Sequence, residues 1–310
     1  MTTTTKPQEN TLEDHVEVEI PAEGGVTLHA WLFVPSTGTA PFPAITMAHG
    51  FAGMKYRALR DYASYFTSLG FVVLVHDHRG FGLSGGEIRG DIDPWQQVSD
   101  WRRVISYLEA LPVVDSDRIG LWGTSYAGGH GLVLGATDRR LKAVVVQVPT
   151  ISGSEQSLRR VKPEDRPALE ALYDADERGQ LKGDPPARRA VVSLDPEVPA
   201  AYRSAELIAY HERFPLPDGV PNSGMITLRS SRKASMYDPG HFVGRVSPTP
   251  LLMIVASDDK VTPADLALDA YERALEPKRL LVIEDGHFDS YTTHLRETRE
   301  AAGSWFLTHI

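Results

Sequence analysis

The spacing of apolar and polar residues changes along the chain, and each change predicts a different kind of element. Residues 15–21 (HVEVEIP) and 26–35 (VTLHAWLFVP) alternate apolar with polar positions and are separated by the turn signal AEGG. This pattern predicts an antiparallel hairpin. Residues 43–50 (PAITMAHG) and 71–77 (FVVLVHD) are instead continuous apolar runs, which are typical of strands buried on both faces of a sheet.

Between and after these runs, apolar residues recur at the three- and four-residue spacing of a helix. Residues 54–69 and 94–111 show this spacing, and Pro94 stands at the first helical position, where a missing N–H costs nothing. Further strands are predicted at RIGLWG, LKAVVVQVP, PLLMIVAS and RLLVIED, and further helices at YAGGHGLVLGA, PADLALDAYERAL and 291–308. The alternation predicts an α/β fold, with a mostly parallel sheet, helices on both faces and an antiparallel edge from the leading hairpin.

The alternation is interrupted over residues 151–249, which hold the charge-rich segment SLRRVKPEDRPALEALYDADERGQL and many prolines. That length is unusual for a connection within a compact domain. One interpretation is a long irregular crossover, and the other is an inserted cap over one end of the sheet. We favour the cap because its patterns are partly helical and the sheet resumes afterwards. We therefore expect residues 1–150 and 250–310 to form the core domain.

Composition narrows the functional classes. The chain has 310 residues, 42% of them hydrophobic, which is enough for one large core. Its net charge of -9 argues against partners such as nucleic acid or an anionic membrane surface. The absence of cysteine excludes disulfides, thiolate zinc sites and cysteine nucleophiles. No metal or organic cofactor is implied.

The N-terminus is polar, and no run of about 18 apolar residues occurs, so we expect neither a secretory signal nor a membrane span. These features favour a soluble, cytoplasmic protein. The sequence does not define the oligomeric state, and a homodimer is compatible with it.

The segment LWGTSYAGGH places Ser125 between an apolar strand and a helix of small residues. Ser125 is either a nucleophile or an ordinary hydroxyl in a glycine-rich turn. A sharp strand–serine–helix turn lifts the hydroxyl clear of the sheet and requires small flanking residues, which Gly123 and Ala127 supply. Ala127 replaces the second glycine of the G-x-S-x-G pattern and adds only a methyl group. A serine nucleophile also needs a base, an acid that orients the base, and donors for the oxyanion.

The remaining parts of such a site follow in order. His287 comes directly after the last predicted strand and is the candidate base, and Asp259, in the spacing D-x-V-x-P, is the candidate acid with Asp258 as the alternative. The order serine, acid, histidine is that of the α/β-hydrolase arrangement. The expected oxyanion donors are the backbone N–H groups of Phe51 and Tyr126. The neighbouring His49-Gly50 is expected to form the turn and to have no catalytic role.

Together these motifs resemble the α/β-hydrolase superfamily across nearly the whole chain. HGF (49–51), DHRGFGLSG (77–85), GTSYAG (123–128), SDDKVTP (257–263) and GHFD (286–289) stand in the order of that family. Residues 247–280 more narrowly resemble dienelactone-hydrolase-like bacterial esterases, and they are similar to fungal polyketide acyltransferases.

The resemblance implies a serine hydrolase that cleaves a small-molecule carboxylic ester or thioester through an acyl-enzyme on Ser125. One alternative is an acyltransferase that passes a polyketide-like acyl group to an alcohol by the same triad. A ligand-binding member of the fold with little turnover is the remaining alternative.

Two other patterns point to different chemistry. GFGLSG (80–85) fits G-x-G-x-x-G, but a dinucleotide site needs a helix that opens on these glycines, and the residues that follow resemble a loop. His76 and His78 would lie on one face of a strand, without further clustered ligands, so we expect a structural role.

Five apolar residues of the expected cap could line the substrate pocket or form the cap's own core, and the sequence does not decide between these roles. They are Phe214, Met225, Met236, Tyr237 and Phe242. A pocket lined by several of them would suit a mainly apolar acyl group.

Overall fold

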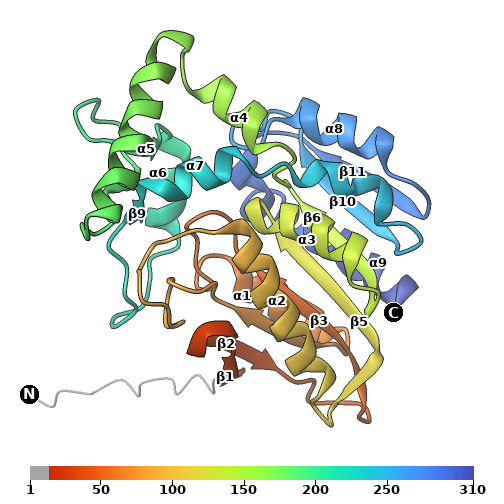
Figure 1. The fold of residues 1–310 in the computed structure, drawn as a ribbon. Helices are drawn as coiled ribbons and strands as arrows, with labels where there is room; N and C mark the ends of the chain where they lie inside the picture. The colour runs from red at the N-terminus through yellow and green to blue at the C-terminus, as the bar shows by residue number, and fades with distance from the viewer. Residues whose placement is uncertain (1–13) are drawn as a thin grey trace, which may run out of the picture.

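The computed structural model describes residues 14–310, and a single eight-stranded sheet runs through the core (Figure 1). The strand order is β1-β2-β4-β3-β5-β6-β10-β11. The β1–β2 and β2–β4 pairs are antiparallel, and the other pairs are parallel. The strands are β1 (Val16–Pro21), β2 (Thr27–Phe33), β3 (Phe42–Ala48), β4 (Val72–His76), β5 (Val114–Thr124), β6 (Leu141–Gln147), β10 (Leu251–Ala256) and β11 (Lys278–Ile283).

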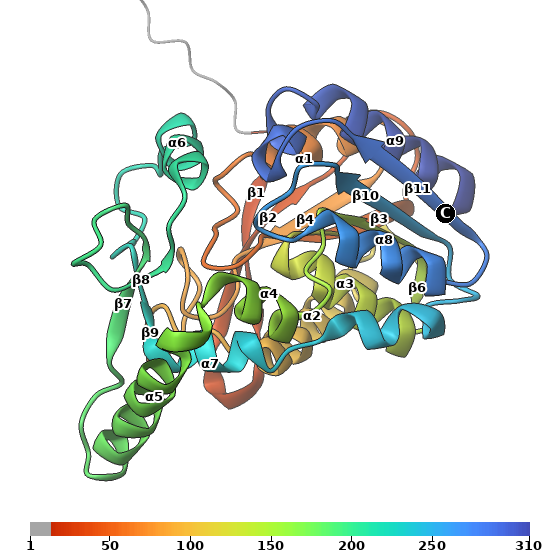
Figure 2. The ribbon, with the colours of Figure 1, turned by 90° about the horizontal axis from the view of Figure 1, so that it is seen from above.

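Helices cover both faces of this sheet, because the buried strands present apolar side chains alternately to either side (Figures 1 and 2). On one face lie α1 (Leu59–Ser68) and α9 (Leu295–His309). On the other lie α2 (Pro94–Glu109), α3 (Tyr126–Thr137) and α8 (Ala264–Arg273). The predicted mostly parallel sheet, with helices on both faces and an antiparallel edge from the leading hairpin, is confirmed.

The main differences from the predicted elements lie at helix ends. The helix expected over 54–69 begins only at Leu59, because Ala58 has a left-handed backbone with φ of 62°. The C-terminal helix begins at Leu295, after the short 3-10 helix η4 (His287–Tyr291). Within residues 14–310, no helix is both long enough and apolar enough to cross a membrane.

Residues 151–249 contain helices and a small separate sheet with the strand order β8-β7-β9. In Figure 2, α5, α6 and this sheet stand beside the core, whereas α4 and α7 lie along it. The last part of the segment, η3, packs against α3 and α8. The segment comprises α4 (Gly153–Arg160), η2 (Pro163–Asp165), α5 (Arg166–Leu181), β7 (Arg188–Val192), β8 (Ala200–Tyr202), α6 (Ala205–Arg213), β9 (Met225–Thr227), α7 (Leu228–Ser235) and η3 (Pro239–Arg245). Its division from the core at residues 150 and 250 stays a prediction.

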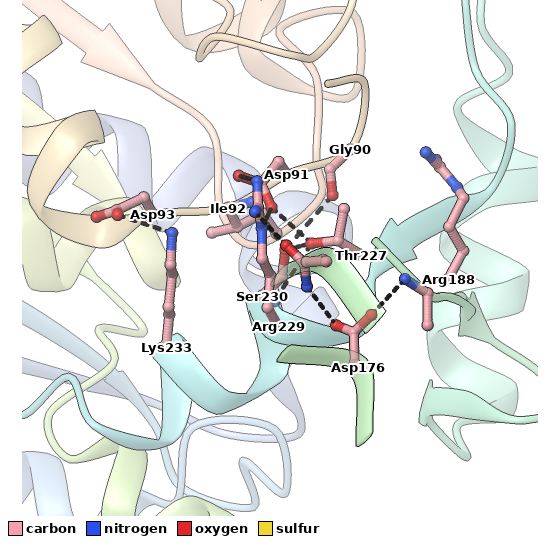
Figure 3. Close-up of polar contacts among 12 residues, drawn as sticks. Gly90, Asp91, Ile92, Asp93, Asp176, Arg188, Thr227, Arg229, Ser230 and Lys233 are labelled. Atoms are coloured by element: carbon pink, nitrogen blue, oxygen red, sulfur yellow. Dashed lines mark hydrogen bonds and ion pairs between the residues drawn. The ribbon is translucent and has the colours of Figure 1, made fainter. Parts of the chain in front are cut away.

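A polar network joins the beginning of α7 to the loop that precedes α2 (Figure 3). Arg229 makes two hydrogen bonds of 2.8 Å to the carboxylate of Asp91, one to each oxygen. The Ser230 hydroxyl accepts a hydrogen bond of 2.8 Å from the backbone N–H of Ile92. Lys233 lies 2.9 Å from Asp93, the residue that caps α2. The network therefore fixes α7, and the strand before it, to the core.

Replacing Arg229 by Met is expected to lower the free energy of unfolding by about 1–3 kcal/mol, because a partly buried carboxylate loses a bidentate charged partner. Urea unfolding followed by circular dichroism measures this loss, and limited proteolysis should show faster cleavage within residues 151–249. Arg296→Met is the matched control, since the Arg296–Glu300 pair lies exposed on α9. Equal stability of the two variants would contradict the assigned role of the network.

Candidate active site

Ser125 occupies a strained turn between β5 and α3. Its backbone has φ of 55° and ψ of -119°, outside the regions that residues with a side chain normally adopt. The turn is held by hydrogen bonds: the Ser125 N–H donates to the Gln147 carbonyl at 2.8 Å, and the Ser125 carbonyl accepts from Thr150 at 2.9 Å. The surrounding sheet and helix thus impose a conformation that exposes the hydroxyl at the carboxyl end of the parallel strands.

The glycines around Ser125 are required by close contacts. A Cβ atom at position 123 would lie 2.3 Å from the carbonyl oxygen of Ala127, and one at position 128 would lie 2.9 Å from Pro149. The chain therefore needs glycine at 123 and 128, whereas position 127 accommodates a methyl group in the buried interior. This explains why the alanine in GTSYAG leaves the turn intact.

The loops that follow β10 and β11 bring the candidate acid and base together. Nδ1 of His287 lies 2.7 Å from Oδ2 of Asp259, and both side chains are buried. Oδ1 of Asp259 accepts backbone hydrogen bonds from Val261 at 2.8 Å and from Thr262 at 2.7 Å. This carboxylate is therefore held in one orientation, and the imidazole is placed with Nε2 as its free nitrogen.

Asp258, the alternative acid, points elsewhere. Its side chain is 70% exposed and pairs with Lys260 at 3.2 Å. The geometry therefore favours Asp259. Thr262, which the sequence analysis did not single out, also contacts the acid: its hydroxyl lies 2.8 Å from Oδ2 of Asp259 and 2.9 Å from the Val148 carbonyl.

The expected oxyanion donors flank the serine. A Cβ atom on Gly50 would lie 2.7 Å from Cβ of Ser125, so the turn after β3 approaches the nucleophile directly. The Tyr126 N–H is at the N-terminus of α3, where helix N–H groups have no acceptor within the helix. The Phe51 and Tyr126 rings meet edge to face, with centroids 5.3 Å apart.

The turn after β3 rests on a buried ion pair that the sequence analysis missed. Lys55 and Asp77 are both fully buried, and their charged groups lie 2.5 Å apart. Asp77 also accepts a hydrogen bond of 2.7 Å from the backbone N–H of Lys55. Nδ1 of His49 lies 3.0 Å from the Gly50 carbonyl, so His49 supports the turn, as predicted. The pair and the histidine together hold the HGF segment in place.

Four buried histidines pack edge to face beneath this turn. The ring centroids of His49 and His78 are 4.6 Å apart, those of His76 and His78 are 5.1 Å apart, and His78 lies 5.6 Å from His130. Burial lowers the pKa of His76 and of His130 to about 3 and lowers that of His78 well below its usual value. These rings are therefore neutral at physiological pH.

Ser125 and His287 face the same cavity, which has a volume of about 60 Å³. The segment 151–249 contributes Tyr202, Leu207, Tyr210 and His211 to its lining. Burial, with a smaller contribution from Arg57, lowers the pKa of His211 to about 4, so this histidine is uncharged at neutral pH.

The five apolar residues considered from the sequence do not line this cavity. Tyr237 is fully buried between the segment and the core, whereas Met236 is 73% exposed. Sequence periodicity could not identify the lining residues, because it does not show which part of the long segment folds back onto the cavity; the residues that do so are Tyr202 and three residues of α6. The apolar character of the cavity comes instead from aromatic rings such as Tyr202 and Tyr210.

The two misleading motifs are structural. The glycines of GFGLSG lie in a loop, and α2 begins only at Pro94, so no helix opens on them as a dinucleotide site would require. His76 packs edge to face on Trp101. Over residues 14–310, no group of three or more His, Cys, Asp or Glu side chains is arranged to hold a metal ion.

Comparison with known proteins identifies the family to which the chain belongs. A family model described as X-Pro dipeptidyl-peptidase (S15 family) matches residues 24–193, more than half of the chain. The chain belongs to the α/β-hydrolase family. Within that family it falls in the S15 and dienelactone-hydrolase-like branch of serine hydrolases, which confirms the resemblance seen in the sequence. The matched region contains Ser125 and ends before Asp259 and His287.

The relatives of this α/β-hydrolase include proteins named as polyketide transferases and thiohydrolases. The polyketide transferase grgF of a Penicillium species is 32% identical over 276 residues, which cover 88% of this chain and 89% of the relative. A thiohydrolase of Eupenicillium brefeldianum is 30% identical over 279 residues, covering 88% and 87%. The crystal structure of the α/β-hydrolase GrgF from Penicillium sp. sh18 superimposes with a TM-score of 0.83 at 29% identity, covering 95% of this chain and 98% of that chain.

Proposed function

We propose that the protein cleaves a carboxylic ester or thioester through an acyl-enzyme on Ser125. The observation that carries the proposal is the 2.7 Å contact between His287 and Asp259 beside a cavity that also exposes the strained Ser125. A serine becomes nucleophilic only when a base oriented by a third group can remove its proton. The thiohydrolase relative supports the same class of substrate.

The proposed reaction begins when Nε2 of His287 removes the hydroxyl proton of Ser125 and Oγ attacks the carbonyl carbon of the substrate. Asp259 holds the Nδ1–H tautomer and stabilises the imidazolium that forms. The N–H groups of Phe51 and Tyr126 stabilise the oxyanion. Collapse breaks the C–O or C–S bond, and the leaving group takes the proton from His287. Water then repeats the sequence and releases the acid.

Acyl transfer to an alcohol is the second candidate, supported by the polyketide transferase relatives. The first half-reaction is the same, and an alcohol replaces water in the second. Product analysis in the presence of a series of alcohols separates the two functions. Free acid as the sole product with every alcohol tested would favour the hydrolase, whereas a new ester as the main product would favour the transferase.

Intact-mass spectrometry after treatment with a fluorophosphonate tests the proposed nucleophile. We expect a single adduct on the wild-type protein and none on Ser125→Ala, because only a serine activated by a base reacts readily. Ser304→Ala, which removes an exposed hydroxyl on α9, should keep the adduct. A folded wild-type protein that forms no adduct, or a Ser125→Ala variant that does, would contradict the proposal.

A further inference from the structure

A second cavity of about 60 Å³ shares part of its lining with the cavity that holds Ser125. Two rings, Phe51 and Tyr202, belong to the lining of both and therefore stand between them. Their centroids are 5.8 Å apart in an edge-to-face arrangement. Tyr126, the residue after the candidate nucleophile, lines the second cavity as well. The second cavity thus adjoins the candidate active site and is separated from it by one layer of aromatic side chains.

Two arginines face this second cavity without a carboxylate partner. Arg160 and Arg189 both line it, and its lining contains no acidic side chain. Across residues 14–310, neither guanidinium lies within ion-pair distance of an Asp or Glu. Arg160 lies over the ring of Tyr202, 4.9 Å from its centroid. Two cations therefore share one chamber with no counter-charge supplied by the described chain.

Arg189 is the more confined of the two. Its Nε is buried and has no hydrogen-bond partner in the part of the chain that the structure describes. Burial, together with the nearby charges of Arg160 and Arg203, lowers the pKa of Arg189, which shows that its charged form is poorly compensated. An anion placed between the two arginines would remove that penalty.

Further hydrogen-bond donors converge on the same chamber. Gln156 is 5% exposed and Tyr126 is 4% exposed, yet Nε2 of the first and the hydroxyl of the second have no partner within residues 14–310. The hydroxyl of Ser231 is likewise buried and unpartnered there. All three residues line the cavity. Buried polar groups are nearly always satisfied in folded proteins, so such a cluster indicates a bound polar group.

We propose that this chamber is a subsite for an anionic, oxygen-bearing group of the substrate, such as a carboxylate held by Arg160 and Arg189. The inference rests on the proposed function, since it narrows the substrate of the same site to charged esters or thioesters. The anionic group belongs either to the far end of the acyl chain or to the leaving group. Both arrangements place it beyond Phe51 and Tyr202 while the reacting carbonyl lies at Ser125.

The test compares esters matched in length and differing in charge. For the acyl chain, the pair is mono-para-nitrophenyl adipate and para-nitrophenyl hexanoate, with suberate and octanoate as a longer pair. For the leaving group, the pair is para-carboxyphenyl hexanoate and its neutral carboxamide analogue. The quantity measured is the ratio of kcat/KM for the charged ester to that for the neutral ester.

We expect the wild-type enzyme to prefer the charged member of one pair, and Arg189→Gln or Arg160→Gln to lower the ratio by about tenfold to a hundredfold, as for a lost charged hydrogen bond. Arg178→Gln is the matched control, because it removes an exposed positive charge from α5, outside both cavities. It should leave the ratio unchanged. The pair that responds identifies which part of the substrate carries the charge.

Calorimetric binding of the charged and neutral esters to Ser125→Ala separates this inference from the proposed function. If the charged ester binds to Ser125→Ala and binds more weakly once Arg189→Gln is added, the subsite is supported. This holds even if the wild-type protein turns over no ester, a result that would contradict only the proposed function. Turnover of neutral and charged esters at equal kcat/KM, unaffected by either arginine, would overturn the subsite and leave the hydrolase intact. That result would identify the chamber as holding water only.

Discussion

Asp259→Asn is expected to lower kcat for ester hydrolysis by about 10⁴-fold while the protein stays folded. The carboxamide would present an N–H₂ group to Nδ1 of His287 and so favour the tautomer with the proton on Nε2. In that tautomer the imidazole cannot accept the proton of Ser125. Steady-state kinetics on a para-nitrophenyl ester measures the loss, and KM should change little because Asp259 lies outside the lining of the substrate cavity.

Asp258→Asn is the matched control for this prediction, because it removes the neighbouring carboxylate, which is exposed and pairs with Lys260. Its kcat should remain within about twofold of the wild-type value, as for a solvent-exposed ion pair that touches no substrate. A large loss of kcat in Asp258→Asn together with near-normal kcat in Asp259→Asn would show that Asp258, and not Asp259, is the acid of the triad. Comparable losses in both variants would point to a collapsed loop, which the circular dichroism spectrum would reveal.

Stability is expected to fall steeply as the pH drops below about 6.5, the usual pKa of histidine. His76, His78 and His130 are neutral in the folded protein because burial lowers the pKa of each. The unfolded chain binds these protons and the folded chain does not, so acid favours unfolding. At about pH 5 each of the three would cost roughly 2 kcal/mol. Their sum, on the order of 6 kcal/mol, is comparable to the whole stability of a typical domain.

Urea unfolding at several values between about pH 7.5 and about pH 5 measures this effect. His76→Phe keeps an aromatic ring against Trp101 and removes one titrating group. It should reduce the slope of the unfolding free energy against pH by the equivalent of close to one bound proton per molecule. His294→Gln is the control: His294 is partly exposed near Glu297 and Asp285, and its pKa is raised, so its removal should leave the acid-induced loss in place. Unchanged stability of the wild-type protein down to about pH 5 would contradict the prediction.

The core sheet and the order of the candidate site residues could be predicted because their signals are local. A buried parallel strand needs a continuous apolar run, and the turn at Ser125 needs small residues on either side, so both leave a short and recognisable pattern. Asp259 and His287 were found in the same way, each directly after a strand. The start of α1 was predicted too early, because the left-handed backbone before it is adopted by Ala58 and not by a glycine, which would have indicated such a conformation in the sequence.

Other features depend on contacts between distant segments. Lys55 and Asp77 form a buried pair across 22 positions, and neither residue type suggests burial from its local sequence. The spacing D-x-V-x-P favoured Asp259 over its neighbour, but the 2.7 Å contact between Asp259 and His287 is visible only in the structure. Part of the lining of the candidate active site was also visible only in the structure. It comes from residues of the 151–249 segment that the apolar periodicity did not identify.

The sequence by itself determined the fold class, the order of the candidate triad residues along the chain and the absence of cysteine chemistry, because apolar periodicity, glycine placement and composition can be read without the tertiary structure. The tertiary structure alone decided how four histidine rings pack edge to face beneath the HGF turn, and that Arg160 and Arg189 face one chamber. These facts depend on distances between side chains from different elements. Such distances are set by packing of the whole chain, and no local pattern encodes them.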